Sequence, residues 1–169
     1  MRSAPVAALA GILLLGGLLV ATPRAARADD APPAAADSVI LIADLAGAAE
    51  VPGPGDPDGA GFAFLVLDPA AGEICYTLTV RDVAPPPAAA HLHHGGADTA
   101  GPVVVSLAAP DGQGLASACA TGLDPALVHA LADAPADFYV NVHTAAYPNG
   151  AVRGQLRPYD PTDGPDGDE

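Results

Sequence analysis

The chain of 169 residues has no lysine, no tryptophan and one methionine, and only 4% of its residues are aromatic. Six arginines oppose 20 acidic residues, which gives a formal net charge of −14. Polyanions repel such a chain, so nucleic acid and anionic lipid are excluded as favoured partners. No internal repeat of about 20 to 50 residues is visible, which excludes solenoids and propellers. The length predicts a single domain.

The first 28 residues carry an early arginine, then an uncharged apolar run over 6–21, and small residues around Ala28. This pattern is typical of a secretory signal peptide, here residues 1–28. The run is shorter than the roughly 20 residues that span a bilayer. We therefore expect a secreted, extracytoplasmic protein with no stable membrane insertion after cleavage.

Two acidic segments rich in proline flank the central part of the chain. Residues 29–37 and residues 158–169 have little to bury, so we expect a disordered linker and a disordered acidic tail. The intervening body, residues 38–157, is large enough to build one hydrophobic core.

Within the body, short apolar runs alternate with clusters of the 19 glycines and 19 prolines, a pattern typical of an all-β domain. Residues 62–67 and 74–81 flank a Pro/Gly turn and are expected to form an antiparallel hairpin. Residues 138–144 and 151–157 flank an Asn-Gly turn, which predicts a second hairpin.

One helix is expected. Asp124 followed by Pro125 is typical of an N-cap with proline in the first helical position, which predicts a short helix over 125–131. With about eight short strands, the fold class is all-β: an antiparallel immunoglobulin-like or superoxide-dismutase-like β-sandwich.

Cys75 and Cys119 are the only cysteines. An oxidising compartment allows disulfides to persist, so we expect these two residues to be bonded. The bridge would close a loop of about 45 residues, which the chain-entropy model values at about 4 kcal/mol. Alternation in the strand over 74–81 places Cys75 on the outer face, so the bridge is expected to join a neighbouring strand end or a covering loop.

Four of the five histidines lie in two strand-like segments, AHLHHGG and VNVHT. In an extended chain His91 and His93 share a face, while His94 points to the other. If the two strands are neighbours, His143 joins this pair, and three imidazoles form a geometry that copper or zinc accepts. Whether His94 adds to the cluster stays open. The alternative is that the histidines make structural hydrogen bonds only.

Three segments, residues 45–52, 89–107 and 138–156, resemble in order and spacing the CHRD domain, first described in chordin and found in many secreted microbial proteins. The resemblance implies an extracytoplasmic β-sandwich with no generally established enzymatic activity. The family pattern falls on His91, His93, Gly95, Gly101, His143, Gly150, Arg153, Gly154 and Gln155.

The chain also has a weaker similarity to the copper/zinc superoxide dismutases. His91, His93 and His143 match the three copper ligands of that family in type and order. The loop that follows His94 has no histidine to bridge to a zinc site. The strong negative charge is poorly suited to steering superoxide, although Arg153 could supply local positive charge.

The sequence assigns no catalytic residue. Glu50 with Asp56 or Asp58 could form a pair of acids, but these residues occupy a Pro/Gly loop in which solvated carboxylates are expected. We therefore expect an exported CHRD-type domain that acts as a non-catalytic binding or structural module for an unknown extracellular ligand or protein. The alternative is a mononuclear copper or zinc protein with superoxide-dismutase-like redox activity at His91, His93 and His143. No other cofactor is implied.

Overall fold

The computed structural model describes residues 38–83 and 86–162. The expected signal peptide, the expected linker and residues 163–169 of the expected tail lie outside these ranges. The elements of the described chain are β1 Val39–Ala46, η2 Gly47–Ala49, β2 Ala60–Asp68, β3 Glu73–Arg81, β4 Pro87–His94, β5 Val103–Leu107, β6 Leu115–Ala120, α1 Pro125–Asp133, η3 Pro135–Asp137, β7 Phe138–Thr144, β8 Val152–Gln155 and β9 Arg157–Pro158.

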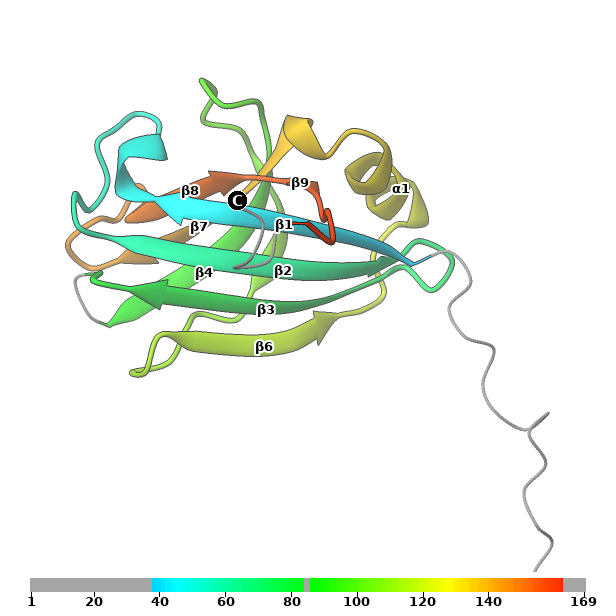
Figure 1. Ribbon diagram of the computed structural model, residues 1–169, viewed down its shortest axis with the longest axis horizontal. Coiled ribbons are helices and arrows are strands. Elements are labelled where there is room, and N and C mark those ends of the chain that lie inside the picture. Colours follow the sequence, from blue (N-terminus) through cyan, green and yellow to red (C-terminus); the bar gives the residue numbers. More distant parts are fainter. Residues whose placement is uncertain (1–37, 84–85, 163–169) are drawn as a thin grey trace, which may run out of the picture. The chain divides into compact units, whose positions relative to one another are not determined.

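The strands form one sheet in the order β5-β4-β7-β8-β1-β2-β3-β6, with β9 paired to β1. Every pairing is antiparallel. In Figure 1, β1, β2, β3 and β6 run side by side while β4 passes behind them. The end strands β5 and β6 contact each other, so the sheet is nearly closed. The predicted all-β antiparallel fold with one short helix is confirmed. Its two layers belong to one continuous sheet.

Both predicted hairpins are present. Strands β2 and β3 pair along their full lengths, and β7 pairs with β8. Pro158, the first residue of the expected tail, pairs with Leu41 of β1 in the two-residue strand β9. Asp124 caps α1 because its side chain accepts a hydrogen bond from the amide of Ala126 at 2.9 Å. Among the described residues, no helix has the length and hydropathy needed to cross a membrane.

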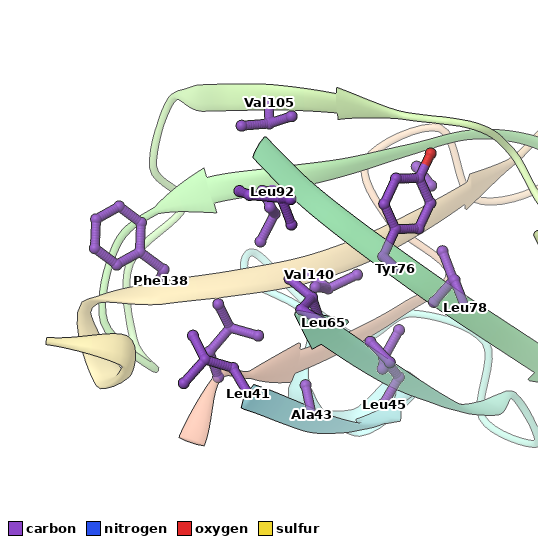
Figure 2. Close-up of a cluster of buried hydrophobic side chains, with 14 of the residues drawn as sticks. Leu41, Ala43, Leu45, Leu65, Tyr76, Leu78, Leu92, Val105, Phe138 and Val140 are labelled. Atoms are coloured by element: carbon purple, nitrogen blue, oxygen red, sulfur yellow. The ribbon is translucent and has the colours of Figure 1, made fainter. Parts of the chain in front are cut away.

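The core lies between the two layers of the sheet (Figure 2). Leu41, Leu65 and Leu78 come from β1, β2 and β3, and Leu92 and Val140 come from β4 and β7. Each of these side chains is at most 1% exposed. Burying a side chain of this size contributes about 1.5–3 kcal/mol. Since side chains alternate along a strand, the residues between these core positions lie on the outer face of the sheet.

Cys75 and Cys119 form the predicted disulfide. The two residues are directly opposite each other in the pairing of β3 with β6. The bond therefore lies outside the main core, as the alternation in β3 indicates, and it joins the end strand β6 to its neighbour.

Candidate metal centre

Three histidines converge on the outer face of β4 and β7. The two strands are neighbours, with Ala89 opposite His143, His91 opposite Asn141 and His93 opposite Tyr139. This register brings one ring nitrogen from each of His91, His93 and His143 within 4.8 Å of the others. The closest pair is His91 Nδ1 and His143 Nε2, 3.1 Å apart. Strand parity and strand order together bring the three residues into one cluster.

A backbone carbonyl fixes the tautomer of His93. Its Nδ1 lies 2.8 Å from the carbonyl oxygen of Gly101, which only accepts hydrogen bonds, so Nδ1 carries the proton. In the neutral ring Nε2 is then an unprotonated lone-pair donor. The side chain is 8% exposed, and Nε2 is buried with no hydrogen-bond partner among the described residues.

The ring of His143 is held in the same way. Its Nδ1 donates to the carbonyl oxygen of Pro148 at 3.1 Å, which leaves Nε2 unprotonated and facing the cluster. Burial lowers the pKa of His143, the hydrogen bond to the Pro148 carbonyl opposes this shift, and the neighbouring His93 adds to it. Burial also lowers the pKa of His91, with additional contributions from His143 and His93. Both imidazoles are therefore neutral at pH 7, the form in which histidine binds metals.

The loop from Gly95 to Pro102 is fastened to the sheet beside the cluster. Arg153 donates to the carbonyl oxygens of Gly96 at 2.7 Å and Thr99 at 3.1 Å. Gln155 Nε2 donates to the carbonyl oxygen of Gly95 at 2.7 Å. Because the same loop carries the Gly101 carbonyl that orients His93, Arg153 and Gln155 support the histidine from a distance.

Tyr139 connects this loop to the cluster. Its ring stacks on His93 with the centroids 4.7 Å apart, and the Arg153 guanidinium lies 3.5 Å from the same ring. The Tyr139 hydroxyl accepts a hydrogen bond from the Gly101 amide at 3.1 Å. The sequence pattern indicates only that Tyr139, four residues before His143, lies on the same face of the strand.

Two glycines of the family pattern have a clear physical reason. A Cβ atom at Gly101 would overlap the carbonyl group of His94, so the loop closes only around glycine. Gly150 has a φ of +138°, and a Cβ there would overlap the carboxyl group of Glu50. These two positions lie in the loops that supply the Gly101 and Pro148 carbonyls to the cluster.

Two further histidines do not join the cluster. His94 is exposed and its ring contacts Phe138 with the centroids 5.0 Å apart. His129 is exposed on α1. The cluster in the structure is therefore made by His91, His93 and His143.

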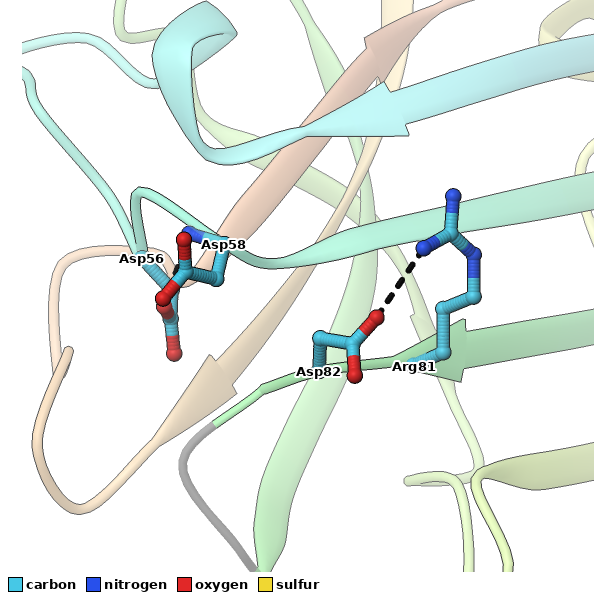
Figure 3. Close-up of polar contacts among 4 residues, drawn as sticks. All are labelled: Asp56, Asp58, Arg81 and Asp82. Atoms are coloured by element: carbon cyan, nitrogen blue, oxygen red, sulfur yellow. Dashed lines mark hydrogen bonds and ion pairs between the residues drawn. The ribbon is translucent and has the colours of Figure 1, made fainter.

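The acidic loop differs from expectation. Glu50 and Asp56 are only 6% and 7% exposed, so the prediction of solvated carboxylates is wrong for these two residues. Asp58 is exposed, and its amide donates to Asp56 Oδ1 at 3.3 Å (Figure 3). Burial raises the pKa of Glu50 to about 7, although the Arg153 charge opposes the shift. Gly150 lies against the carboxyl group of Glu50. This contact joins residues that are distant in the sequence, so local sequence patterns do not predict it.

Asn141 is a second residue, besides Tyr139, that the sequence pattern did not single out. It is 3% exposed, lies opposite His91, and places its Oδ1 3.1 Å from His143 Nε2. The signal was present in the alternation of the strand, because Asn141 shares a face with His143.

A family model described as the CHRD domain matches residues 41–156. No curated protein matches the chain, and no solved structure matches it. The matched segment includes the three converging histidines and all six of the other positions in the family pattern. The chain belongs to the CHRD domain family.

Proposed function

We propose that this chain is an exported, non-catalytic binding module whose ligand is a single copper or zinc ion, held by His91 Nδ1, His93 Nε2 and His143 Nε2. The observation that carries the proposal is the orientation of His93. Its Nδ1 is fixed on the Gly101 carbonyl, while its unprotonated Nε2 is buried and has no hydrogen-bond partner within residues 38–83 and 86–162. A metal-ligating histidine almost always has this arrangement, with the second ring nitrogen bonded to a carbonyl or carboxylate.

The distances within the cluster suit a metal ion. Nitrogens bound to one zinc ion at about 2.0 Å in a tetrahedral arrangement lie roughly 3.3 Å from each other. His91 Nδ1 and His143 Nε2 are 3.1 Å apart, and the third nitrogen lies within 4.8 Å. A purely structural cluster would leave the buried Nε2 of His93 unsatisfied, which costs about 1–3 kcal/mol.

Export is supported by two features of different kinds. The disulfide between Cys75 and Cys119 is of a type that persists in oxidising compartments. The first 28 residues have the pattern of a secretory signal peptide.

Calorimetric titration of the chelator-stripped full chain with Cu²⁺ and Zn²⁺ tests the proposal. We expect close to one equivalent of metal for the wild type. His91→Ala and His143→Ala should each weaken binding by at least about tenfold. The matched control is His129→Ala, because His129 is an exposed histidine on α1 and its loss should leave binding unchanged.

The stability of the metal-free and metal-loaded forms supplies the second readout. Ligand at 100 times its Kd stabilises the folded state by about 2.7 kcal/mol. Metal should therefore raise the Tm of the wild type and of His129→Ala but not of His91→Ala. If His91→Ala lowers the Tm relative to the wild type by the same amount with and without metal, the cluster has a structural role and the proposal is overturned.

A further inference from the structure

Asn141 lies beside the histidine cluster on β7. It lies directly opposite His91 in the pairing of β4 with β7 and two residues before His143 on β7. Its side chain is 3% exposed, and its Oδ1 is 3.1 Å from His143 Nε2. This separation is the same as that between His143 Nε2 and His91 Nδ1, so the amide oxygen lies at the distance expected of a fellow ligand.

The cluster has more lone pairs than protons. His93 and His143 keep their protons on Nδ1, where the Gly101 and Pro148 carbonyls accept them. Their Nε2 atoms and Asn141 Oδ1 are therefore all acceptors. His91 Nδ1 lies 3.1 Å from His143 Nε2 and can donate to that atom only while it is not bound to a metal. Asn141 Oδ1 faces a lone pair instead of a donor, and a cation at the centre removes this repulsion.

We propose that Asn141 is the fourth ligand of the centre, through Oδ1, and that the site is therefore selective for a four-coordinate divalent ion over Cu⁺. This inference rests on the proposed function. Three imidazoles are sufficient for Cu⁺, which is soft and gains little from an amide oxygen, whereas Zn²⁺ and Cu²⁺ accept mixed nitrogen and oxygen ligands. The oxygen thus contributes mainly to the binding of the divalent ions.

The test compares Zn²⁺ and Cu⁺ affinities by competition with chromophoric chelators, using the full chain with a reductant present only for Cu⁺. Asn141→Ala should weaken Zn²⁺ binding by at least about tenfold and leave Cu⁺ binding within about threefold. Asn141→Asp keeps an oxygen in the same place and should bind Zn²⁺ at least as tightly as the wild type. With Co²⁺ as a spectroscopic probe, Asn141→Ala should change the visible absorption bands, because the ligand set changes.

Three outcomes overturn the inference. Unchanged Zn²⁺ affinity and unchanged Co²⁺ bands in Asn141→Ala would show that the amide is not a ligand. Equal losses of Zn²⁺ and Cu⁺ affinity would assign Asn141 a structural role. Failure of Asn141→Asp to retain Zn²⁺ would show that an oxygen donor at this position does not contribute. The proposed function itself fails if the wild type binds neither ion. It also fails if the wild type and His91→Ala bind the ions with equal affinity.

Discussion

Glu50 is an acidic residue whose burial disfavours the charged form of its side chain. In the part of the chain that the structure describes, its Oε1 is buried without a hydrogen-bond partner, and the Gly150 backbone lies against its carboxyl group. Arg153 is close enough to act on Glu50 electrostatically, but its own hydrogen bonds go to the Gly96 and Thr99 carbonyls. The charged carboxylate therefore loses hydration without gaining an ion pair in return.

Replacement of Glu50 by glutamine should change how stability depends on pH. Burial raises the pKa of Glu50 to about 7 from its ordinary value of 4.5, so the folded state binds this proton more tightly than the unfolded state does. The stability contributed by the neutral acid is fully present below about pH 4.5 and is lost as the pH rises to about 7. Glu50→Gln should be more stable than the wild type at pH 8, by no more than about 3 kcal/mol, and nearly equal to it at pH 4.5.

Urea unfolding of both proteins between pH 4.5 and pH 8 measures this difference. The control is Asp98→Asn, which removes one charge from an exposed acid that lines the same pocket as Glu50. A Glu50→Gln stability difference that does not grow between pH 4.5 and pH 8 would contradict the raised pKa of Glu50.

At the scale of elements, the connection between β4 and β5 is held by long side chains from β8. Arg153 is 1% exposed, and its guanidinium binds two carbonyl groups of this loop. Gln155 binds a third carbonyl, that of Gly95. The loop therefore has its backbone acceptors satisfied by the sheet, which explains how a glycine-rich segment holds the Gly101 carbonyl in place for His93.

Arg153→Met should lower the free energy of unfolding by at least about 2 kcal/mol, because it removes the two charge-assisted hydrogen bonds that the buried guanidinium donates to the Gly96 and Thr99 carbonyls. Arg81→Met is the matched control. Arg81 forms an exposed ion pair with Asp82 at 2.9 Å (Figure 3), and exposed pairs contribute about 0–1 kcal/mol. Chemical denaturation gives both values, and hydrogen exchange at the amides of residues 95–101 should accelerate in Arg153→Met alone. Similar losses in the two variants would contradict this role for Arg153.

At the scale of the whole molecule, the disulfide joins strands that are distant in sequence. Cys75 and Cys119 are separated by 44 positions, and β6 stands at one end of the strand order. Removing the bond in Cys75→Ala/Cys119→Ala should cost about 2–4 kcal/mol, mainly because the unfolded chain gains freedom.

The next exposed cross-strand pair offers a control for the disulfide. Thr77 and Ser117 lie opposite each other in the same two strands, with their hydroxyl oxygens 3.4 Å apart. Thr77→Ala/Ser117→Ala should cost less than about 1 kcal/mol. Urea unfolding compares the two double variants, and equal losses would mean that the disulfide contributes no more than an ordinary side-chain pair.

Much of the fold could be predicted from the sequence because it follows from local rules. Alternation and turn residues predict the hairpins over β2–β3 and β7–β8, and the Asp124 cap predicts the start of α1. The sharing of a face by His91 and His93 is also local. His143 lies close to this pair only because β4 and β7 are neighbours. The sequence alone does not predict that these two strands pair.

The remaining features depend on contacts between distant segments. Glu50 is buried because Gly150, a hundred residues later, has no side chain to keep the loop away. Asn141 gains significance only when β4 places His91 opposite it. The orientation of His93 depends on a carbonyl group that no side-chain pattern reveals. Strand periodicity carries no information about such contacts.

The burial of Arg153 also determines how the folded chain meets a protease. Trypsin cleaves after lysine and arginine, and the chain has no lysine. Among the described residues, Arg153 is inaccessible within β8 and Arg157 precedes a proline, whose peptide bond trypsin does not cut. Arg81, at the exposed end of β3, is the remaining site in these ranges. Cleavage there separates Cys75 from Cys119, so the two fragments of the native protein should stay joined until the disulfide is reduced.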